Sequence, residues 1–226
     1  FLRGCGYTRE EVIGRTPLEL GIWVDPAQRA LFVTRIQRDG VIRDMQGDFR
    51  AKTGRITTLI VNADLIELGG EPCMLTLGID ITERRRREQV QTATFQISRA
   101  VLAGGDLEML FAEVHSIIRG LMAAKNFYVA LLSADGSELS FPYFVDEYVP
   151  PPPSRRRDRG FTEYVLETNL PQRVTAPELA EILRARGLQQ TLERPAAQRL
   201  GAPLFAGGRA LGVIALQDYT HADAYG

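Results

Sequence analysis

The spacing of apolar residues changes at Gly40, and this change constrains the fold more than any other feature of the sequence. Residues 25–40 begin with Asp25-Pro26 and place apolar side chains three or four positions apart, as an amphipathic helix does. After Gly40 the apolar period is about two. Three such runs occur, at 41–51, 56–68 and 72–81. Turn-rich segments separate them, so the pattern predicts three antiparallel strands in hairpin order next to a helix, an α+β arrangement.

The second half of the chain also alternates between helical and strand patterns. Gly104-Gly105 separates two amphipathic helices predicted at 89–103 and 107–123. The turn 134–136 is a strong hairpin signal. The strands predicted after the helices are 126–133, 138–144, 171–174, 200–206 and 209–219, and the further helices are 160–169, with Thr162 as its cap, and 177–187.

This order predicts two α+β domains, each an antiparallel β-sheet flanked by helices. The first covers 1–82 and the second covers 105–226, with a helical linker over 83–104. A length of 226 residues suits this division, because domains most often contain about 100 to 150 residues.

Charge and hydropathy exclude several classes of partner. The 27 basic residues nearly balance the 28 acidic ones, which argues against a surface built for nucleic acid or an anionic membrane. No apolar run reaches the roughly 20 residues that a membrane span needs, and the start lacks a signal-peptide pattern. The chain begins at Phe1 and ends without a closing helix. We therefore expect a cytoplasmic fragment of a longer protein, whose other parts are free to be membrane-anchored.

The sequence predicts neither a metal site nor a catalytic site. Cys5 and Cys73 are far apart and have no second ligand at metal-binding spacing, so both are expected to be free thiols. No phosphate-binding glycine loop, nucleophile elbow or metal-spaced cluster occurs. We expect this chain not to be an enzyme, and any catalysis to reside elsewhere in the longer protein.

Two segments of the first domain resemble PAS sensory domains. GYTREEVIGR, at 6–15, is similar to a helical segment of that family, and GIDITER, at 78–84, is similar to the end of its last strand. The resemblance covers 1–82 and implies that a complete domain would have two more strands before Phe1.

The second domain resembles GAF sensory domains. LGAPLFAGGRALGVIALQDY, at 200–219, is similar to the final hairpin of that family, and GFTEYV, at 160–165, is similar to one of its helix starts. The resemblance covers about 90–226 and implies a further helix beyond Gly226.

Together these resemblances imply a sensory or regulatory input region of a bacterial signal-transduction protein. PAS and GAF domains commonly stand in tandem before an output domain, most often in a two-component sensor histidine kinase that works in a phosphorelay. The input region of a diguanylate cyclase or phosphodiesterase is an alternative. A ligand-binding enzyme regulator and a ligand-free dimerisation module are two others.

The same resemblances argue against several cofactors and identify none, so the cofactor of this chain is unknown. Residues 1–82 contain no histidine for haem and no flavin-binding cysteine motif, and no cysteine follows Cys73 to hold a bilin covalently. The spacing from Phe141 to Asp146 differs from that of cyclic-nucleotide-binding relatives. His115 is predicted to be a partly exposed structural histidine without a partner ligand.

Aromatic and aliphatic side chains on the predicted elements either line a ligand pocket or fill a core, and the spacing favours a core. If pockets exist, their walls are expected to be Trp23, Phe32 and Leu75 in the first domain, and Phe127, Val129, Phe141, Tyr143, Tyr164 and Leu216 in the second. A small-molecule effector is a possible occupant.

The linker carries the residues expected to transmit a signal. Asp80 and Thr82 stand where a strand becomes a helix, and both side chains are able to bond nearby backbone. Val90 and Ile97 belong to an apolar stripe, 90-93-97-100, at coiled-coil spacing, so a homodimer through this helix is expected. The four arginines at 84–87 point all around a helix and predict a solvated neck rather than a nucleic-acid patch.

Overall fold

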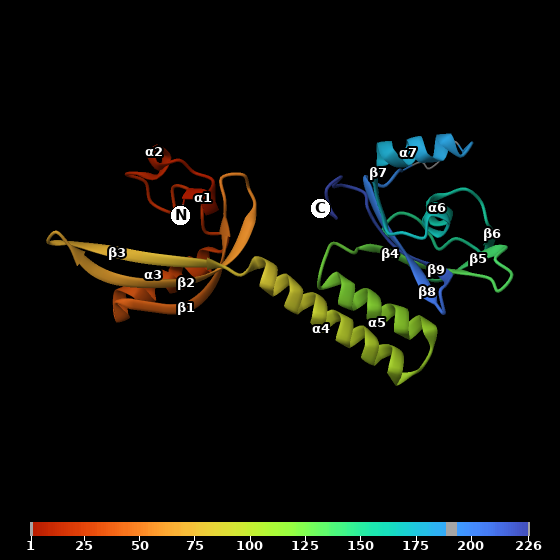
Figure 1. Cartoon of the computed structure of the whole chain (residues 1–226), viewed down its shortest axis with the longest axis horizontal. Coiled ribbons are helices and arrows are strands. Elements are labelled where there is room, and N and C mark those ends of the chain that lie inside the picture. Colours follow the sequence, from red (N-terminus) through yellow and green to blue (C-terminus); the bar gives the residue numbers. More distant parts are fainter. Residues whose placement is uncertain (1, 189–193, 226) are drawn as a thin grey trace. The chain divides into compact units, whose positions relative to one another are not determined.

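The computed structural model describes residues 2–188 and 194–225. It divides into two compact units, Phe1–Gln89 and Val90–Gly226, called unit 1 and unit 2 below. The division falls inside helix α4 (Thr82–Ala103), within the stretch where the sequence predicts a linker. Figure 1 labels the elements of both units.

Unit 1 begins with two short helices, α1 (Leu2–Cys5) and α2 (Arg9–Val12), and continues with α3 (Pro26–Asp39). The predicted start of α3 is confirmed, because the Asp25 carboxylate accepts a hydrogen bond of 2.8 Å from the backbone N–H of Ala27. Gly40 ends the helix at φ 68°, a conformation that glycine adopts without strain.

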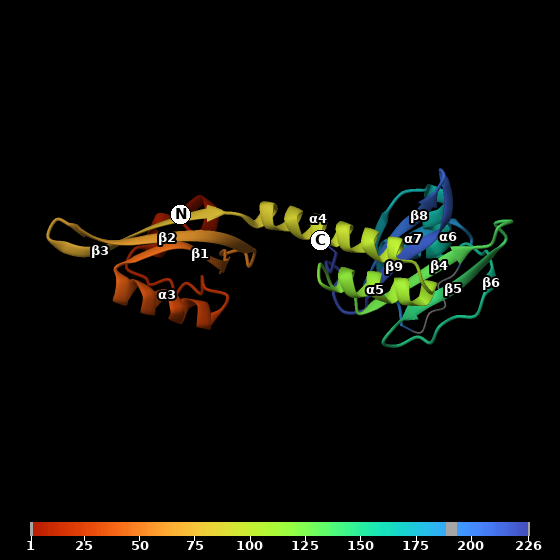
Figure 2. The same ribbon diagram turned by 90° about the horizontal axis from the view of Figure 1, so that it is seen from below.

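The three predicted strands of unit 1 are confirmed, each within one residue at both ends. They are β1 (Val41–Arg50), β2 (Ile56–Leu68) and β3 (Glu71–Asp80), in the antiparallel order β1-β2-β3. Figure 2 shows α3 against one face of this sheet. The core between them contains Phe32, Ile36, Ile42, Met45, Val61 and Ala63.

The other face of this sheet is largely uncovered at β3. Leu75 pairs with Asp64 of β2, on the face opposite to the one that holds Ala63 and the core. Its side chain is 60% exposed. The prediction that Leu75 shares a pocket wall with Trp23 and Phe32 is therefore wrong, because a strand alternates its faces and the sequence alone does not say which face the helix covers.

Unit 2 is built on a six-stranded antiparallel sheet in the order β6-β5-β4-β9-β8-β7. Its strands are β4 (Asn126–Leu132), β5 (Glu138–Val145), β6 (Arg155–Arg156), β7 (Gln172–Thr175), β8 (Gln198–Ala206) and β9 (Arg209–Asp218). Its helices besides the second part of α4 are α5 (Leu107–Arg119), α6 (Phe161–Thr168) and α7 (Ala176–Ala185). Each predicted strand and helix has a counterpart, whereas the two-residue strand β6 had not been predicted.

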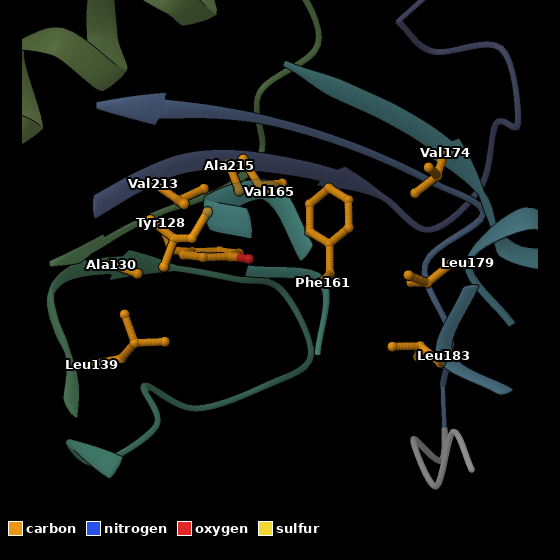
Figure 3. Packing of buried hydrophobic residues seen from close by; sticks show 11 residues of the cluster. Tyr128, Ala130, Leu139, Phe161, Val165, Val174, Leu179, Leu183, Val213 and Ala215 are labelled. Atoms are coloured by element: carbon orange, nitrogen blue, oxygen red, sulfur yellow. The ribbon is translucent and has the colours of Figure 1, made fainter. Parts of the chain in front are cut away.

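A separate core lies on each face of this sheet. On one face Phe127, Val129 and Leu216 pack with Val114 and Ile118 of α5. On the other face Tyr128, Ala130, Val213 and Ala215 pack with residues of α6 and α7, as Figure 3 shows. Neighbouring residues of β4 thus serve opposite cores, as the pleat of a strand requires.

One local prediction is corrected by the structure. Gly160 precedes α6 as its cap, and Thr162 lies inside the helix, where its hydroxyl meets Tyr128. The linker helix begins at Thr82, one residue before the start of the helical linker predicted over 83–104. None of the helices within 2–188 and 194–225 combines the length and apolarity needed to cross a bilayer.

Candidate functional site

The passage from β3 into α4 is the most highly connected of the predicted sites. The Asp80 carboxylate accepts a hydrogen bond of 2.9 Å from the backbone N–H of Thr82. The Thr82 hydroxyl in turn accepts a bond of 3.0 Å from the backbone N–H of Thr58 in β2. The carbonyl of Thr58 accepts a bond of 3.0 Å from Ile81. The first residue of α4 is therefore fastened to the neighbouring strand. The sequence placed Asp80 and Thr82 within reach of nearby backbone, but it did not identify Thr58 as a partner.

The joint between β3 and α4 extends to β1, the third strand of the sheet. The Thr58 hydroxyl donates a hydrogen bond of 2.7 Å to Asp48 of β1, and Arg85 of α4 stands 3.9 Å from the same carboxylate. The bonds from Thr82 lower the pKa of Asp80, so the carboxylate stays charged. Asp48 and Thr58 were missed by the sequence analysis, because their role depends on strand register.

The arginine run next to the joint is not one surface. Arg84 pairs with Glu88 one turn later, at 2.8 Å, as residues four apart on a helix are able to do. Arg85 turns to Asp48 instead. The run contributes to the joint through one of its members.

The structure divides the six pocket residues predicted in unit 2 between the two faces of the sheet. Phe127, Val129, Tyr143 and Leu216 belong to the core beside α5. Phe141 packs against the opposite core, with its ring 6.0 Å from that of Tyr128. Tyr164 lies on α6, where Arg186 stands over its ring at 5.9 Å. These residues do not line one pocket.

In unit 1 two of the three predicted pocket residues do meet. Trp23 lies 5.3 Å from Phe32 and 4.7 Å from Phe49, between ring centroids. All three rings pack in or against the core under α3. They form an aromatic cluster in contact with one another, which is the alternative that the spacing favoured.

His115 is more buried than predicted, with 5% of its surface exposed. Its Nε2 lies 2.6 Å from the carbonyl oxygen of Ala124, and its Nδ1 lies 3.0 Å from the hydroxyl of Tyr143. The ring also stacks on Phe127 at 4.5 Å. Because a carbonyl only accepts, Nε2 carries a proton, and Nδ1 accepts from Tyr143 when the ring is neutral. Both nitrogens have partners, so the structural interpretation of His115 is supported.

A buried polar cluster lies at α6 in unit 2, and no pattern in the sequence predicts it. The side chain of Glu163 is fully buried. One of its oxygens accepts a bond of 2.5 Å from Arg155 and another of 2.9 Å from the backbone N–H of Asp158. Burial raises the pKa of Glu163, but these bonds and the charge of Arg155 outweigh it and hold that pKa below its usual value. Glu163 thus fastens the segment before α6 to the helix.

Two atoms near this cluster are buried and have no hydrogen-bond partner among the described residues. They are the second carboxylate oxygen of Glu163 and Nε of Arg199. The Tyr128 hydroxyl bonds to Thr162 at 2.9 Å and feels the charges of both side chains. An acceptor and a donor are therefore left over beside one tyrosine, an arrangement that suits a water or a small polar molecule.

A surface hollow of about 410 Å³ is lined by residues 144–151, at the end of β5 and in the segment after it. None of the predicted pocket residues contributes to it. Within the part of the chain that the structure describes, no group of three or more His, Cys, Asp or Glu side chains is placed to hold a metal ion.

Comparisons with known proteins add structural similarities only. No protein-family model matches the chain, and no curated protein matches it significantly. The GAF domain of A. aeolicus nlh2 in an inactive state is 14% identical, with 60% of this chain and 83% of that chain covered and a TM-score of 0.46.

A putative GAF sensor protein from Burkholderia vietnamiensis is 19% identical, with 61% and 82% covered and a TM-score of 0.47. The chromophore-binding domain of Stigmatella aurantiaca bacteriophytochrome is 14% identical, with 97% and 79% covered and a TM-score of 0.41. Scores and identities this low do not by themselves establish a family or a function for this chain.

The Thr82 hydroxyl is expected to stabilise unit 1. Thr82→Val keeps the shape of the side chain but leaves the N–H of Thr58 without an acceptor, which should lower the free energy of unfolding by about 1–3 kcal/mol. Thr82→Ser retains the oxygen and should remain within about 0.5 kcal/mol of the parent. Urea unfolding followed by circular dichroism measures both. A valine variant as stable as the serine variant would contradict this role.

Proposed function

We propose that this chain is a non-catalytic input region of a cytoplasmic signal-transduction protein, with a PAS-like unit followed by a GAF-like unit. The observation that carries the proposal is the hydrogen bond from Thr58 to Thr82. Through it a change in the sheet of unit 1 acts directly on the first turn of α4. A relay of this kind needs an element with two states, and α4 is that element.

The sequence resemblance supports a sensor histidine kinase as the output to which α4 reports. The input region of a diguanylate cyclase or phosphodiesterase is the second candidate. The same joint would serve either output, because a helix leaving the sheet transmits displacement or rotation whatever follows it.

Hydrogen exchange tests the relay. Phe32→Leu loosens the core under α3, and we expect faster exchange at the amides of residues 83–89, because their helix is fastened to that sheet. Residues 97–103 of the same helix lie in unit 2 and provide an internal reference. Leu68→Ala is the matched control, since Leu68 is an exposed residue at the end of β2. Exchange at 83–89 that is the same in both variants would argue against the relay.

We also propose a homodimer through α4, with a seam different from the predicted one. Ala93 of the predicted stripe is 5% exposed and Ile97 is half-buried, on a helix that lies beside α5 in both Figure 1 and Figure 2. Val90 and Val101 are 50% and 56% exposed, and their separation of eleven residues places them on the same face of the helix. This exposed pair, rather than the whole stripe, is therefore open to a second copy.

Sedimentation distinguishes these two parts of the stripe. Val90→Asp should weaken dimerisation while leaving unit 2 folded, because half of the Val90 side chain is in solvent. Ile97→Asp should instead destabilise unit 2, since it places a charge against a packed helix. A dimer that Val90→Asp leaves unchanged would exclude Val90 from the interface.

A small polar effector beside Tyr128 is the alternative to purely mechanical sensing, and the two partnerless atoms of Glu163 and Arg199 support it. Native mass spectrometry of the purified protein should then show an adduct that Glu163→Leu loses, because leucine offers no acceptor. Glu167→Gln, on the exposed side of the same helix, is the control. A parent protein free of adducts would favour water at this position and a ligand-free module.

A further inference from the structure

Four consecutive prolines, at 150–153, lie between β5 and β6 of unit 2. Proline fixes φ near −65°, has no N–H to donate, and forces the preceding residue into an extended conformation. Within the described residues, no hydrogen bond joins 150–154 to the rest of the molecule. Proline-rich backbone without internal hydrogen bonds adopts the polyproline II helix, with three residues per turn.

The chain before the prolines is fixed to the sheet. The Asp146 carboxylate accepts bonds of 2.8 Å and 2.9 Å from the backbone N–H groups of Tyr148 and Val149. The same carboxylate accepts a bond of 3.0 Å from the hydroxyl of Tyr219. The ring of Tyr148 meets that of Tyr219 edge-on at 4.7 Å, and Arg194 stands 3.9 Å over it.

The chain after the prolines is fixed to α6. Arg155 donates to the buried carboxylate of Glu163, and Asp158 donates its backbone N–H to the same oxygen. A stiff segment is therefore suspended between two anchored ends, and the order it needs for binding is already present in the free protein.

This segment presents the features of a polyproline ligand. Three-residue periodicity places Pro150 and Pro153 on the same edge, and both are exposed. Val149 before them is 39% exposed, and Arg156 and Arg157, at the other end, are both exposed and add positive charge. Arg157 also lies 4.0 Å from the carboxylate of Glu167. Grooves that bind such P-x-x-P segments are lined by aromatic side chains. An acidic margin on the groove would complement the two arginines.

We propose that residues 149–157 are a docking segment for a partner protein domain with an aromatic-lined, acidic-edged polyproline groove. The prolines supply the apolar ridge, and Arg156 and Arg157 supply the charge that fixes its direction. Because the segment is held extended at both ends, binding loses less conformational entropy than it would with a flexible tail.

The experiment titrates the full 226-residue chain with a purified SH3 domain that binds P-x-x-P ligands, followed by calorimetry. Saturable binding is expected, and a double variant, Pro150→Ala with Pro153→Ala, should weaken it at least about tenfold. Pro171→Ala, in the exposed connection between α6 and β7, is the matched control and should bind like the parent. Circular dichroism should confirm that all variants are folded, because within the described residues Pro150 and Pro153 make no hydrogen bond to the body.

Two results would overturn the proposal. One is an absence of binding by the folded parent chain. The other is equal binding by the parent and the double variant, which would place the contact elsewhere.

Discussion

One side-chain oxygen, the hydroxyl of Thr82, joins the start of the exit helix of unit 1 to the neighbouring strand. Thr58 directs both of its backbone groups toward the edge where β3 has just ended. Its carbonyl accepts a hydrogen bond from the backbone N–H of Ile81. Beyond Ile81, however, no strand residue is left to accept a hydrogen bond from the N–H of Thr58. The hydroxyl of Thr82 accepts that hydrogen bond instead. A side chain thus extends the pairing of β2 and β3 by one hydrogen bond. The helix thereby starts in a fixed orientation to the sheet, whereas a flexible loop at this point would leave it free.

Unit 2 depends on a different requirement, because both faces of its one sheet must be covered. Each of its central strands divides its side chains between the α5 core and the α6–α7 core. Five of the six residues that the sequence offered as pocket walls in unit 2, all except Tyr164, belong to or pack against these two cores. The polar groups around α6 remain available for chemistry. There Glu163 holds the segment before α6 to the helix, and two buried polar atoms have no hydrogen-bond partner among the described residues.

The period of apolar residues predicted the strands of unit 1 within a residue, because tight turns and a covered face leave few alternatives. It failed where a local irregularity reverses the faces. Phe141 and Tyr143 are two apart and would share a face in a regular strand, but a bulge in the β4–β5 pairing places them in different cores. Thr162 was mistaken for a cap for a related reason, since only the fold reveals Tyr128 as its partner. The sequence pointed to Asp80 and Thr82, the two joint residues that lie close together in the chain. It did not point to Thr58 and Asp48, which other strands contribute.

The aromatic cluster of unit 1 has a practical consequence. Trp23 is the single tryptophan of the sequence, and it lies against Phe32 and Phe49 in the core that the sheet shares with α3. Light at a wavelength that only tryptophan absorbs therefore excites unit 1 alone, and the tyrosines of unit 2 do not emit. The emission spectrum of the unmodified protein reports the packing of the core of unit 1, without a dye and without a signal from unit 2.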